Sequence, residues 1–386
     1  MINTIKDENM DINYWLLITY VIIIVANFIY GVSGYEYRII CTQCKLQIKL
    51  SSILSLILLF FLIFLVVRDR DNPDIHNYYS SYEGTEIFIR KKEMGFELLI
   101  TIAKKIGLDF YQFRAIIYVF SGLSIWFFFT KMGLDKNIAF SMYAFYPFVY
   151  DGIQIRNFLA FVIILLFLPS LFSGTKKGIF LYVVGVLISF SIHFIGILYL
   201  IFILINFNSK KIIRKRQKIL IFSFVLSMLL IIFMKILPSI SLKMMNILIS
   251  QLDGARIRNY FDHSGNQWGF VIFLFLELMF VYISKKCRDS LYKNTTKQGV
   301  IMYRLAENIF WINVAICCLS PLLIANVSFY RLFRNILLIN YCIPSIAIAG
   351  RIWKKSLCFI FIFAFLANAI WSYMTDSIYV FLVFFN

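Results

Sequence analysis

Long apolar runs separated by short polar segments fill most of this sequence. A helix of about 20 apolar residues crosses the roughly 30 Å hydrocarbon core of a bilayer. The recurrence of such runs along the chain predicts an all-α, polytopic integral membrane protein with about twelve transmembrane helices. We expect these spans at 14–31, 49–67, 111–130, 138–150, 156–172, 178–192, 194–207, 219–236, 268–284, 305–324, 332–349 and 356–372.

Two places in this pattern admit alternatives. The run 138–150 is short, and it could continue into the next helix through a break at Asp151 and Gly152. The runs 178–192 and 194–207 could form one long helix, which would remove a span. The chain shows neither an internal repeat nor a low-complexity tract, so we treat 1–386 as a single transmembrane domain.

Composition supports lipid as the solvent for most side chains. The chain is 61% hydrophobic and 15% charged, with a mean hydropathy of +0.81. Soluble domains carry about 45–50% apolar and about 25% charged residues. A soluble core of this size could not bury so much Phe, Ile and Leu.

The net charge of +18 gathers in a few loops. Basic residues cluster in 207–218, in 285–304 and in 351–355, and Lys176 and Lys177 occupy a tight turn. With twelve spans all of these loops share one side, which the positive-inside rule assigns to the cytoplasm. Both termini and the two larger loops, 68–110 and 237–267, then face outward. We expect no nucleic-acid partner, because no basic face is free of membrane.

The first outer loop, 68–110, contains a second kind of element. Residues 94–106 are typical of a short amphipathic helix, with Phe96, Leu99, Ile100 and Ile106 on one side. Such a helix could lie in the membrane interface.

Arginines at the predicted outer face are candidates for anion binding, since ionisable groups are costly in a bilayer. Arg156 opens the span 156–172; it could snorkel to water, pair with Asp151, or hold a phosphate in a bidentate fork. Arg331 and Arg334 are three residues apart, so a helix places them on one face. Nothing acidic is near them in sequence, and they bind either lipid headgroups or a substrate anion.

Other polar residues suggest proton transfer or sugar binding. His193 interrupts two apolar runs and is either a structural residue or a general acid–base group. The segment 68–79, which includes Arg68, Asp74 and Tyr78, mixes acids, bases and tyrosines. Solvated loop charge is one interpretation, and sugar recognition is the other. The segment 253–268 has a similar composition.

Several site types are absent from the sequence. We find no P-loop, no dinucleotide-binding glycine pattern and no zinc-protease or serine-hydrolase motif. Of the seven cysteines, Cys41 and Cys44 form a single C-x-x-C with no second pair. We therefore predict no metal site and no cofactor. Glu277 and Glu307, in or beside inner halves of spans, are weak candidates for a transporter's proton site.

An ordered set of segments resembles the EpsG-like family of bacterial polysaccharide polymerases, which are Wzy-type membrane proteins. Arg68 followed by D-I-H-N-Y at 74–78 is similar to the family's R…G-x-D-y-x-x-Y. The segment E-M-G-F-E-L-L at 93–99 resembles E-P-G-F-x-x-L, and I-R-N-F-L-A at 155–160 resembles I-R-Q-x-L-A. The segment S-I-H-F at 191–194 resembles x-x-H-x-S, and Arg331 matches a late arginine. Met94 replaces the proline, and Asn157 replaces the glutamine.

This resemblance implies a fold similar to the helical membrane glycosyltransferases that use lipid-linked donors. It implies a polymerase that joins undecaprenyl-pyrophosphate-linked oligosaccharide repeat units at the outer face of the bacterial cytoplasmic membrane. The product would be O-antigen, capsule or exopolysaccharide. Membrane lipid, a chain-length regulator and a flippase would be partners.

The residues suggest a division of roles in such a reaction. Arg156, Arg331 and Arg334 would stabilise the departing pyrophosphate. His193 is the first candidate for the base, with Asp74 or Glu93 next. Tyr78, with Arg68 and Asp151, would help to hold substrate. Two other classes stay open: a lipid-linked oligosaccharide flippase or transporter, and a membrane acyltransferase that modifies glycans.

Overall fold

A computed structural model gives the structure of the chain. It describes residues 13–33, 38–41, 46–70, 72–84, 93–206, 267–292, 296–320, 329–350, 352 and 355–375, together with the single positions 218, 221, 225 and 229. The outer loop expected at 237–267 and the polar segment 253–268 therefore lie almost wholly outside the described residues.

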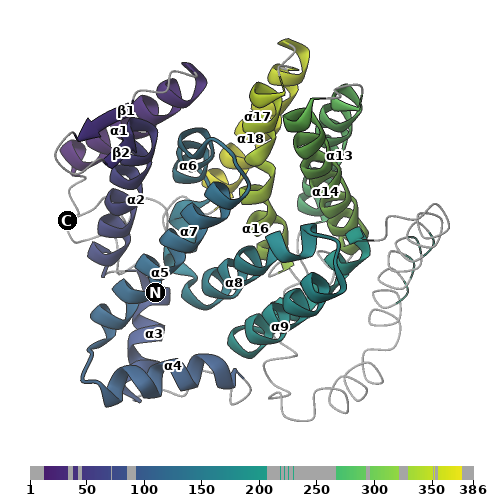
Figure 1. Cartoon of the computed structure of the whole chain (residues 1–386). Coiled ribbons are helices and arrows are strands. Elements are labelled where there is room, and N and C mark those ends of the chain that lie inside the picture. The colour runs from purple at the N-terminus through teal and green to yellow at the C-terminus, as the bar shows by residue number, and fades with distance from the viewer. Residues whose placement is uncertain are drawn as a thin grey trace.

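The described chain is built almost entirely from helices packed side by side (Figure 1). The N-terminal half contains α1 (Tyr14–Ser33), β1 (Arg38–Cys41), β2 (Leu46–Lys49), α2 (Leu50–Arg68), α3 (Pro73–Glu83), α4 (Met94–Lys105), α5 (Phe110–Lys131), α6 (Lys136–Phe145), α7 (Phe148–Ile153), α8 (Ile155–Phe172) and α9 (Lys176–Ile192). The C-terminal half contains η1 (Phe194–Asn206), α13 (Gln267–Leu291), α14 (Lys297–Leu319), α16 (Tyr330–Asn340), α17 (Cys342–Ala349) and α18 (Lys355–Thr375). Strands β1 and β2 form one short antiparallel hairpin before α2.

Side-chain caps set where several helices begin. The Asn72 side chain accepts a hydrogen bond from the Asp74 N–H at 3.1 Å, and Pro73 stands in the first turn of α3. A reciprocal capping box between Asp109 and Gln112 opens α5. These caps satisfy backbone N–H groups that have no partner within the helix. They fix the starts of α3 and α5 in the predicted loop 68–110.

The membrane prediction is confirmed. Seven segments within the described part of the chain are long and apolar enough to cross a bilayer, namely α1, α2, α5, α8, α14, α18 and the joined α16–α17. The expected span 268–284 lies within the single 25-residue helix α13. The expected spans 138–150, 178–192 and 194–207 correspond to shorter or broken helices. Of 219–236 only three positions are described. The chain is thus an all-α polytopic membrane protein, with the small β hairpin as its strand content in the described residues.

The two ambiguous places are resolved by the fold. The run 138–150 divides into α6 and α7 at Pro147, which lacks the N–H that would continue a helix. At His193 the chain reverses: the Tyr182 hydroxyl donates to the Tyr199 carbonyl at 2.9 Å, so α9 and η1 run antiparallel. The 13 residues of the 3₁₀ helix η1 reach about 26 Å at 2.0 Å each. The runs 178–192 and 194–207 therefore form two separate segments and not one long helix.

Helix α4 confirms the short helix predicted at 94–106, but its faces differ from those expected. Phe96 and Ile100 are buried, while Ile106 is exposed and lies just after the helix. Ile106 falls on the opposite side, with the exposed residues Leu98 and Ile102. The expected grouping of Phe96 with Ile106 was wrong, because both faces of α4 are apolar and a single apolar stripe cannot be read from the sequence.

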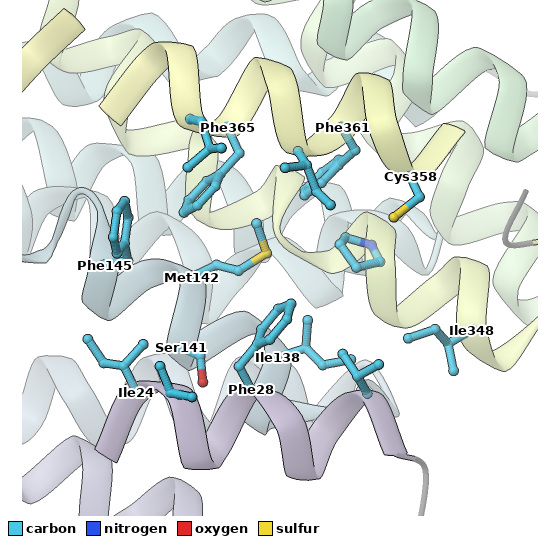
Figure 2. A pocket seen from close by; sticks show the side chains of 15 residues that line it. Ile24, Phe28, Ile138, Ser141, Met142, Phe145, Ile348, Cys358, Phe361 and Phe365 are labelled. Atoms are coloured by element: carbon cyan, nitrogen blue, oxygen red, sulfur yellow. The ribbon is translucent and has the colours of Figure 1, made fainter. Parts of the chain in front are cut away.

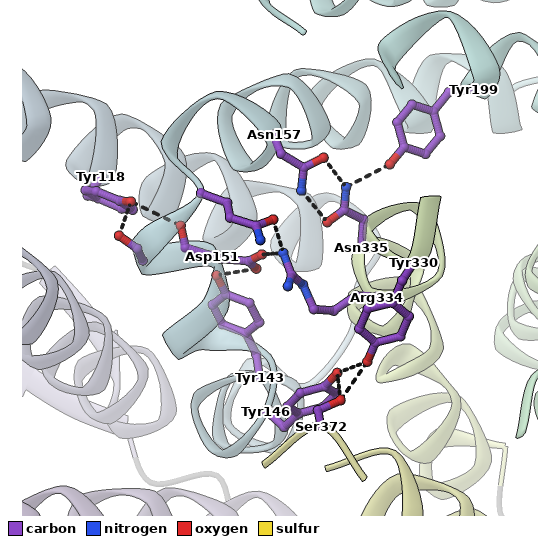
Figure 3. Close-up of polar contacts among 12 residues, drawn as sticks. Tyr118, Tyr143, Tyr146, Asp151, Asn157, Tyr199, Tyr330, Arg334, Asn335 and Ser372 are labelled. Carbon is purple, nitrogen blue, oxygen red and sulfur yellow. Dashed lines mark hydrogen bonds and ion pairs between the residues drawn. The ribbon is translucent and has the colours of Figure 1, made fainter. Parts of the chain in front are cut away.

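Antiparallel packing brings particular helix ends together. Helices α8 and α9 pack along their lengths, and the Ser189 hydroxyl donates to the Ala160 carbonyl at 2.8 Å. The start of α8 therefore lies beside the end of α9, and the basic turn at Lys176 lies at the far end of this pair. The starts of α8 and α16, with the ends of α7 and α18, gather around one polar centre (Figure 3).

Candidate functional site

Arg156, in the first turn of α8, holds two loop elements together. Its guanidinium forms an ion pair with the carboxylate of Glu93, which is the residue before α4. Its Nε lies 3.5 Å from the Tyr78 hydroxyl, and the guanidinium carbon lies 5.3 Å from the centre of the Tyr78 ring. Arg156 and Glu93 are both largely buried, with side chains 12% and 5% exposed. A predicted phosphate ligand is thus positioned by residues from α3 and α4.

Asp74, in the first turn of α3, is within electrostatic range of two of the predicted arginines. Burial raises the pKa of Asp74 above its usual value, and the positive charges of Arg331 and Arg156 oppose that shift. The side chain is half-buried. Asp74 is thus a carboxylate with a raised pKa in the electrostatic field of residues from α8 and α16.

Arg334 is the most deeply buried of these arginines. Its NH2 group donates to the Gln154 side-chain oxygen at 2.6 Å and lies 3.6 Å from a carboxylate oxygen of Asp151 (Figure 3). The other Asp151 oxygen accepts from the Tyr143 hydroxyl at 3.1 Å. The guanidinium carbon also lies 5.1 Å from the Tyr150 ring centre. An ion pair thus connects α16 to α7, inside the protein.

The structure decides two relations among these charges that the sequence left open. Asp151 pairs with Arg334 rather than with Arg156, which takes Glu93 instead. Arg334 has an acid beside it although none is near in sequence. The pair of Arg334 with Asp151 forms because the break at α7 brings Asp151 towards α16, about 180 residues away in the chain.

Three hydroxyls lie on the other side of Arg334. The Tyr146 and Tyr330 hydroxyls contact each other, and the Ser372 hydroxyl lies 2.7 Å from each of them (Figure 3). The Tyr150 hydroxyl donates to the Ser372 carbonyl at 2.7 Å. We call Tyr146, Tyr330 and Ser372 the hydroxyl cluster. It joins the break after α6 with the start of α16 and the end of α18.

A buried amide network lies deeper between α8 and α16. Asn157 and Asn335 exchange side-chain hydrogen bonds of 3.2 and 3.3 Å, and Asn335 also donates to the Tyr199 hydroxyl at 2.9 Å. All three residues are buried. Because unsatisfied buried amides are costly, this network fixes α16 against α8 and holds Arg334 and Arg156 in register.

His193 is buried at the turn between α9 and η1. Its Nδ1 accepts a hydrogen bond from the Ile195 N–H at 3.3 Å, and its ring stacks on Phe194. The Ser189–Ala160 contact lies one helical turn from His193 on α9 and one turn from Arg156 on α8, so both residues occupy the same level. One imidazole nitrogen is therefore engaged by the backbone, and the predicted role in proton transfer stays a prediction.

Gly95 allows the start of α4 to pack closely against the end of α9. A Cβ atom at Gly95 would lie 2.3 Å from the Ser191 hydroxyl and 3.0 Å from the Ser191 backbone carbon. The start of α4, which carries Glu93, thus packs directly on the end of α9. Any side chain at this position would separate the two.

Arg114 is a site-supporting residue that the sequence analysis missed. It is fully buried in α5, donates to the Asp69 carbonyl, and has its NH2 group 3.4 Å from the Gly152 carbonyl. Arg114 thereby ties the end of α2 to the end of α7. A charge one turn inside a predicted span was a signal that could have found it. Arg68, at the end of α2, is half-buried beside this contact.

Within the described ranges, no three His, Cys, Asp or Glu side chains gather as a metal-binding set. The acidic side chains at the site instead face arginines. The site is therefore a set of three arginines and three carboxylates, lined by tyrosine hydroxyls.

The comparison with known families decides the relationship of this chain. A family model described as the EpsG family matches residues 53–384. The chain belongs to the EpsG family. No curated protein and no solved structure matches it.

The EpsG match includes every predicted site residue, from Arg68 to Arg334. Membership of the EpsG family indicates a polysaccharide-polymerase-like role for this multi-pass membrane protein. The roles of the individual residues, the donor and the product are matters of proposal.

Proposed function

We propose that this protein is a glycosyltransferase that polymerises polysaccharide from repeat units linked to undecaprenyl pyrophosphate, at the outer face of the bacterial cytoplasmic membrane. EpsG-family membership supports the polymerase class. A donor linked through pyrophosphate is supported by the arginines of α8 and α16, which lie together at one end of the described helices.

The arginine set suits a pyrophosphate leaving group. Arg156 lies in the first turn of α8 and Arg331 in the first turn of α16, where helix dipoles present their positive ends. Arg334 retains a buried Nε with no hydrogen-bond partner in the described part of the chain. A guanidinium has five N–H donors, so these arginines can bind phosphate oxygens while they keep their carboxylate partners.

The reaction balances with these groups alone. An acceptor hydroxyl oxygen attacks the anomeric carbon of the donor sugar, and the bond from that carbon to the pyrophosphate oxygen breaks. The electron pair leaves with the pyrophosphate, whose added charge the arginines stabilise. The hydroxyl proton passes to a carboxylate or imidazole of the protein.

Asp74 is our preferred base for that proton. It is half-buried, its pKa is raised, and it lies near Arg156 and Arg331, which would hold the leaving group. Glu93 is engaged by Arg156, and the Nδ1 atom of His193 is engaged by the backbone. A base must reach the acceptor hydroxyl, and a raised pKa makes a carboxylate a stronger one. We assign Tyr78 and Arg68 to substrate binding.

The proposal is tested on surface glycan from a strain that lacks the gene. We expect single repeat units in the deletion strain and a restored ladder on complementation. Arg156→Lys keeps the charge but loses the planar fork, so polymer should fall by about 100-fold, as for loss of one oxyanion donor. Arg70→Ala is the matched control, because Arg70 is exposed beside Tyr111 and outside the arginine set.

Two outcomes would replace the proposed function, and a third would change its assignment of residues. Repeat units that never reach the outer face would indicate a flippase. An unchanged ladder with altered decoration would indicate an acyltransferase. A ladder from Arg156→Lys equal to that from Arg70→Ala would remove Arg156 from the leaving-group site. A chain-length regulator and a flippase of the same pathway are the protein partners that this function requires.

A further inference from the structure

An apolar groove opens between α1 and α18 (Figure 2). It has a volume of about 530 Å³. Its sides come from α1 and α18, for example Phe28 and Phe361, and its floor comes from α6 and α17, for example Met142 and Ile348. Cavities of about 300–1,000 Å³ are of the size that holds small ligands.

The lining permits only an apolar occupant. Of the fifteen residues that line the groove, Ser141 and Cys358 alone carry a polar side chain. The Ser141 hydroxyl is already bonded to the Asn137 carbonyl at 2.7 Å. On α1, Val25 and Val32 line the groove and remain about half exposed, so this wall faces the surrounding lipid.

The groove leads to the functional site. Phe145 and Phe365 line the end of the groove nearest the site, with ring centres 5.5 Å apart. The next residue along the chain from Phe145 is Tyr146 of the hydroxyl cluster, and the Tyr373 hydroxyl donates to the Phe145 carbonyl. Beyond the cluster, Tyr150 bonds to Ser372 and lies under the guanidinium of Arg334. An apolar path thus ends at hydroxyls and a buried cation.

The depth of the groove selects a long chain. Along α18, Phe365 lies about 10 Å and Cys358 about 21 Å from Ser372, at 1.5 Å per residue. Half of the hydrocarbon core is about 15 Å. When a lipid headgroup lies at the hydroxyl cluster, its acyl chains reach only to about the middle of the bilayer. A longer isoprenoid chain reaches the far end.

We propose that the groove between α1, α6, α17 and α18 binds the polyprenyl chain of the lipid-linked donor or acceptor, with its phosphate end at the hydroxyl cluster and Arg334. This inference rests on the proposed function for the identity of the lipid. It adds the site at which the chain is recognised and the reason for preferring long chains.

The test uses the full-length protein in phosphatidylglycerol vesicles with undecaprenyl phosphate that carries a diazirine at the end of its chain. After illumination, we expect adducts on Cys358 or Val32, and competition by unlabelled undecaprenyl phosphate. The groove-filling variants are Val25→Trp and Ile362→Trp. The matched controls are Ile22→Trp and Ile370→Trp, which lie exposed on the same two helices outside the groove.

Filling the groove should lower labelling by about tenfold relative to the controls, because exclusion of two methylene groups already has that effect. Adducts only on exposed residues such as Ile18, or equal labelling of filled and control variants, would overturn the inference. A diazirine phospholipid that labels the groove and resists displacement by undecaprenyl phosphate would overturn it as well. The wild-type adduct positions decide the question even if a Trp variant fails to fold.

This binding measurement is independent of polymer formation. Adducts in the groove combined with an unchanged surface ladder in the deletion strain would leave a polyprenyl site and remove the polymerase function. A lost ladder without groove adducts would keep the polymerase and remove the site.

Discussion

Buried arginines at the site lie beside carboxylates from distant parts of the chain. Arg156 meets Glu93, and Arg334 meets Asp151. An unpaired charge in such surroundings is strongly destabilising, so these pairs have a structural role as well as a proposed catalytic one. Experiments at this scale must therefore separate folding from chemistry.

Asp74 provides a pH signature. If its ionised form takes the proton, polymerisation falls as the pH drops through its pKa. Because burial raises that pKa, the acid limb should lie above the ordinary value of about 3.9. Asp74→Asn should abolish the limb and lower the rate by about 100-fold or more. Rates of purified enzyme across pH would show this.

The control for Asp74 is Glu83→Gln, since Glu83 is an exposed carboxylate at the end of the same helix. It should retain both rate and limb. If Asp74→Asn leaves the acid limb of the pH–rate profile unchanged, His193 becomes the candidate base. His193→Gln should then lower the polymerisation rate.

The pair of Arg334 and Asp151 allows stability and activity to be separated. Arg334→Met leaves a buried carboxylate without its cation and should lower stability by about 3–5 kcal/mol. Adding Asp151→Asn removes the stranded charge, so the double variant should recover much of that stability. It should still lack polymerase activity, because the proposed phosphate ligand is gone. Thermal unfolding in detergent and a polymer assay measure the two effects, and an active double variant would contradict the assignment.

At the scale of elements, α4 connects the membrane surface with the site. Its start carries Glu93 and packs on α9 through Gly95, while Leu98 and Ile102 are exposed on its other face. An apolar stripe next to lysines at the end of a helix is typical of an interfacial helix. We therefore expect α4 to rest on lipid while it positions the partner of Arg156.

This placement is measurable with nitroxide labels in protein whose native cysteines are replaced. A label at Leu98→Cys should collide more with lipid-soluble oxygen than with a water-soluble nickel chelate. Lys104→Cys, on a different face of α4, should show the reverse preference. Leu98→Glu should also reduce polymer, whereas equal accessibility at both positions would mean that α4 stands in water.

At the scale of the whole molecule, the antiparallel order of the helices places the candidate site and a basic turn at opposite ends. The site gathers at the starts of α8 and α16, and the basic turn at Lys176 lies at the other end of α8 and α9. The positive-inside rule then predicts that the site faces outward. Lipid-linked repeat units that have already crossed the membrane would meet it there.

Orientation can be tested by thiol labelling in intact cells. Tyr79→Cys, exposed on α3, should react with a membrane-impermeant maleimide. Thr175→Cys, exposed before α9, should react only after permeabilisation. The opposite pattern would place the site in the cytoplasm and favour the acyltransferase, since acyl donors are available on that side.

The sequence by itself determined the class of fold, the EpsG relationship and most of the residue types at the site. The thickness of the bilayer requires long apolar helices, so each span can be recognised from its own stretch of sequence. Arg156, Arg331 and Arg334 stood out because charge near a membrane is costly and therefore informative. The same rule, applied inside the span 111–130, would also have found Arg114.

Only the tertiary structure decided which charges meet, and where an apolar chain can bind. The pairs of Arg156 with Glu93 and Arg334 with Asp151 join residues separated by 63 and about 180 positions, so no local pattern encodes them. The faces of α4 were equally undetermined, because lipid and protein interior both select apolar side chains. For the same reason the groove cannot be recognised from the sequence. Val25, which lines the groove, and Ile22, which faces open lipid, are both aliphatic, and only the placement of α6 and α18 distinguishes them.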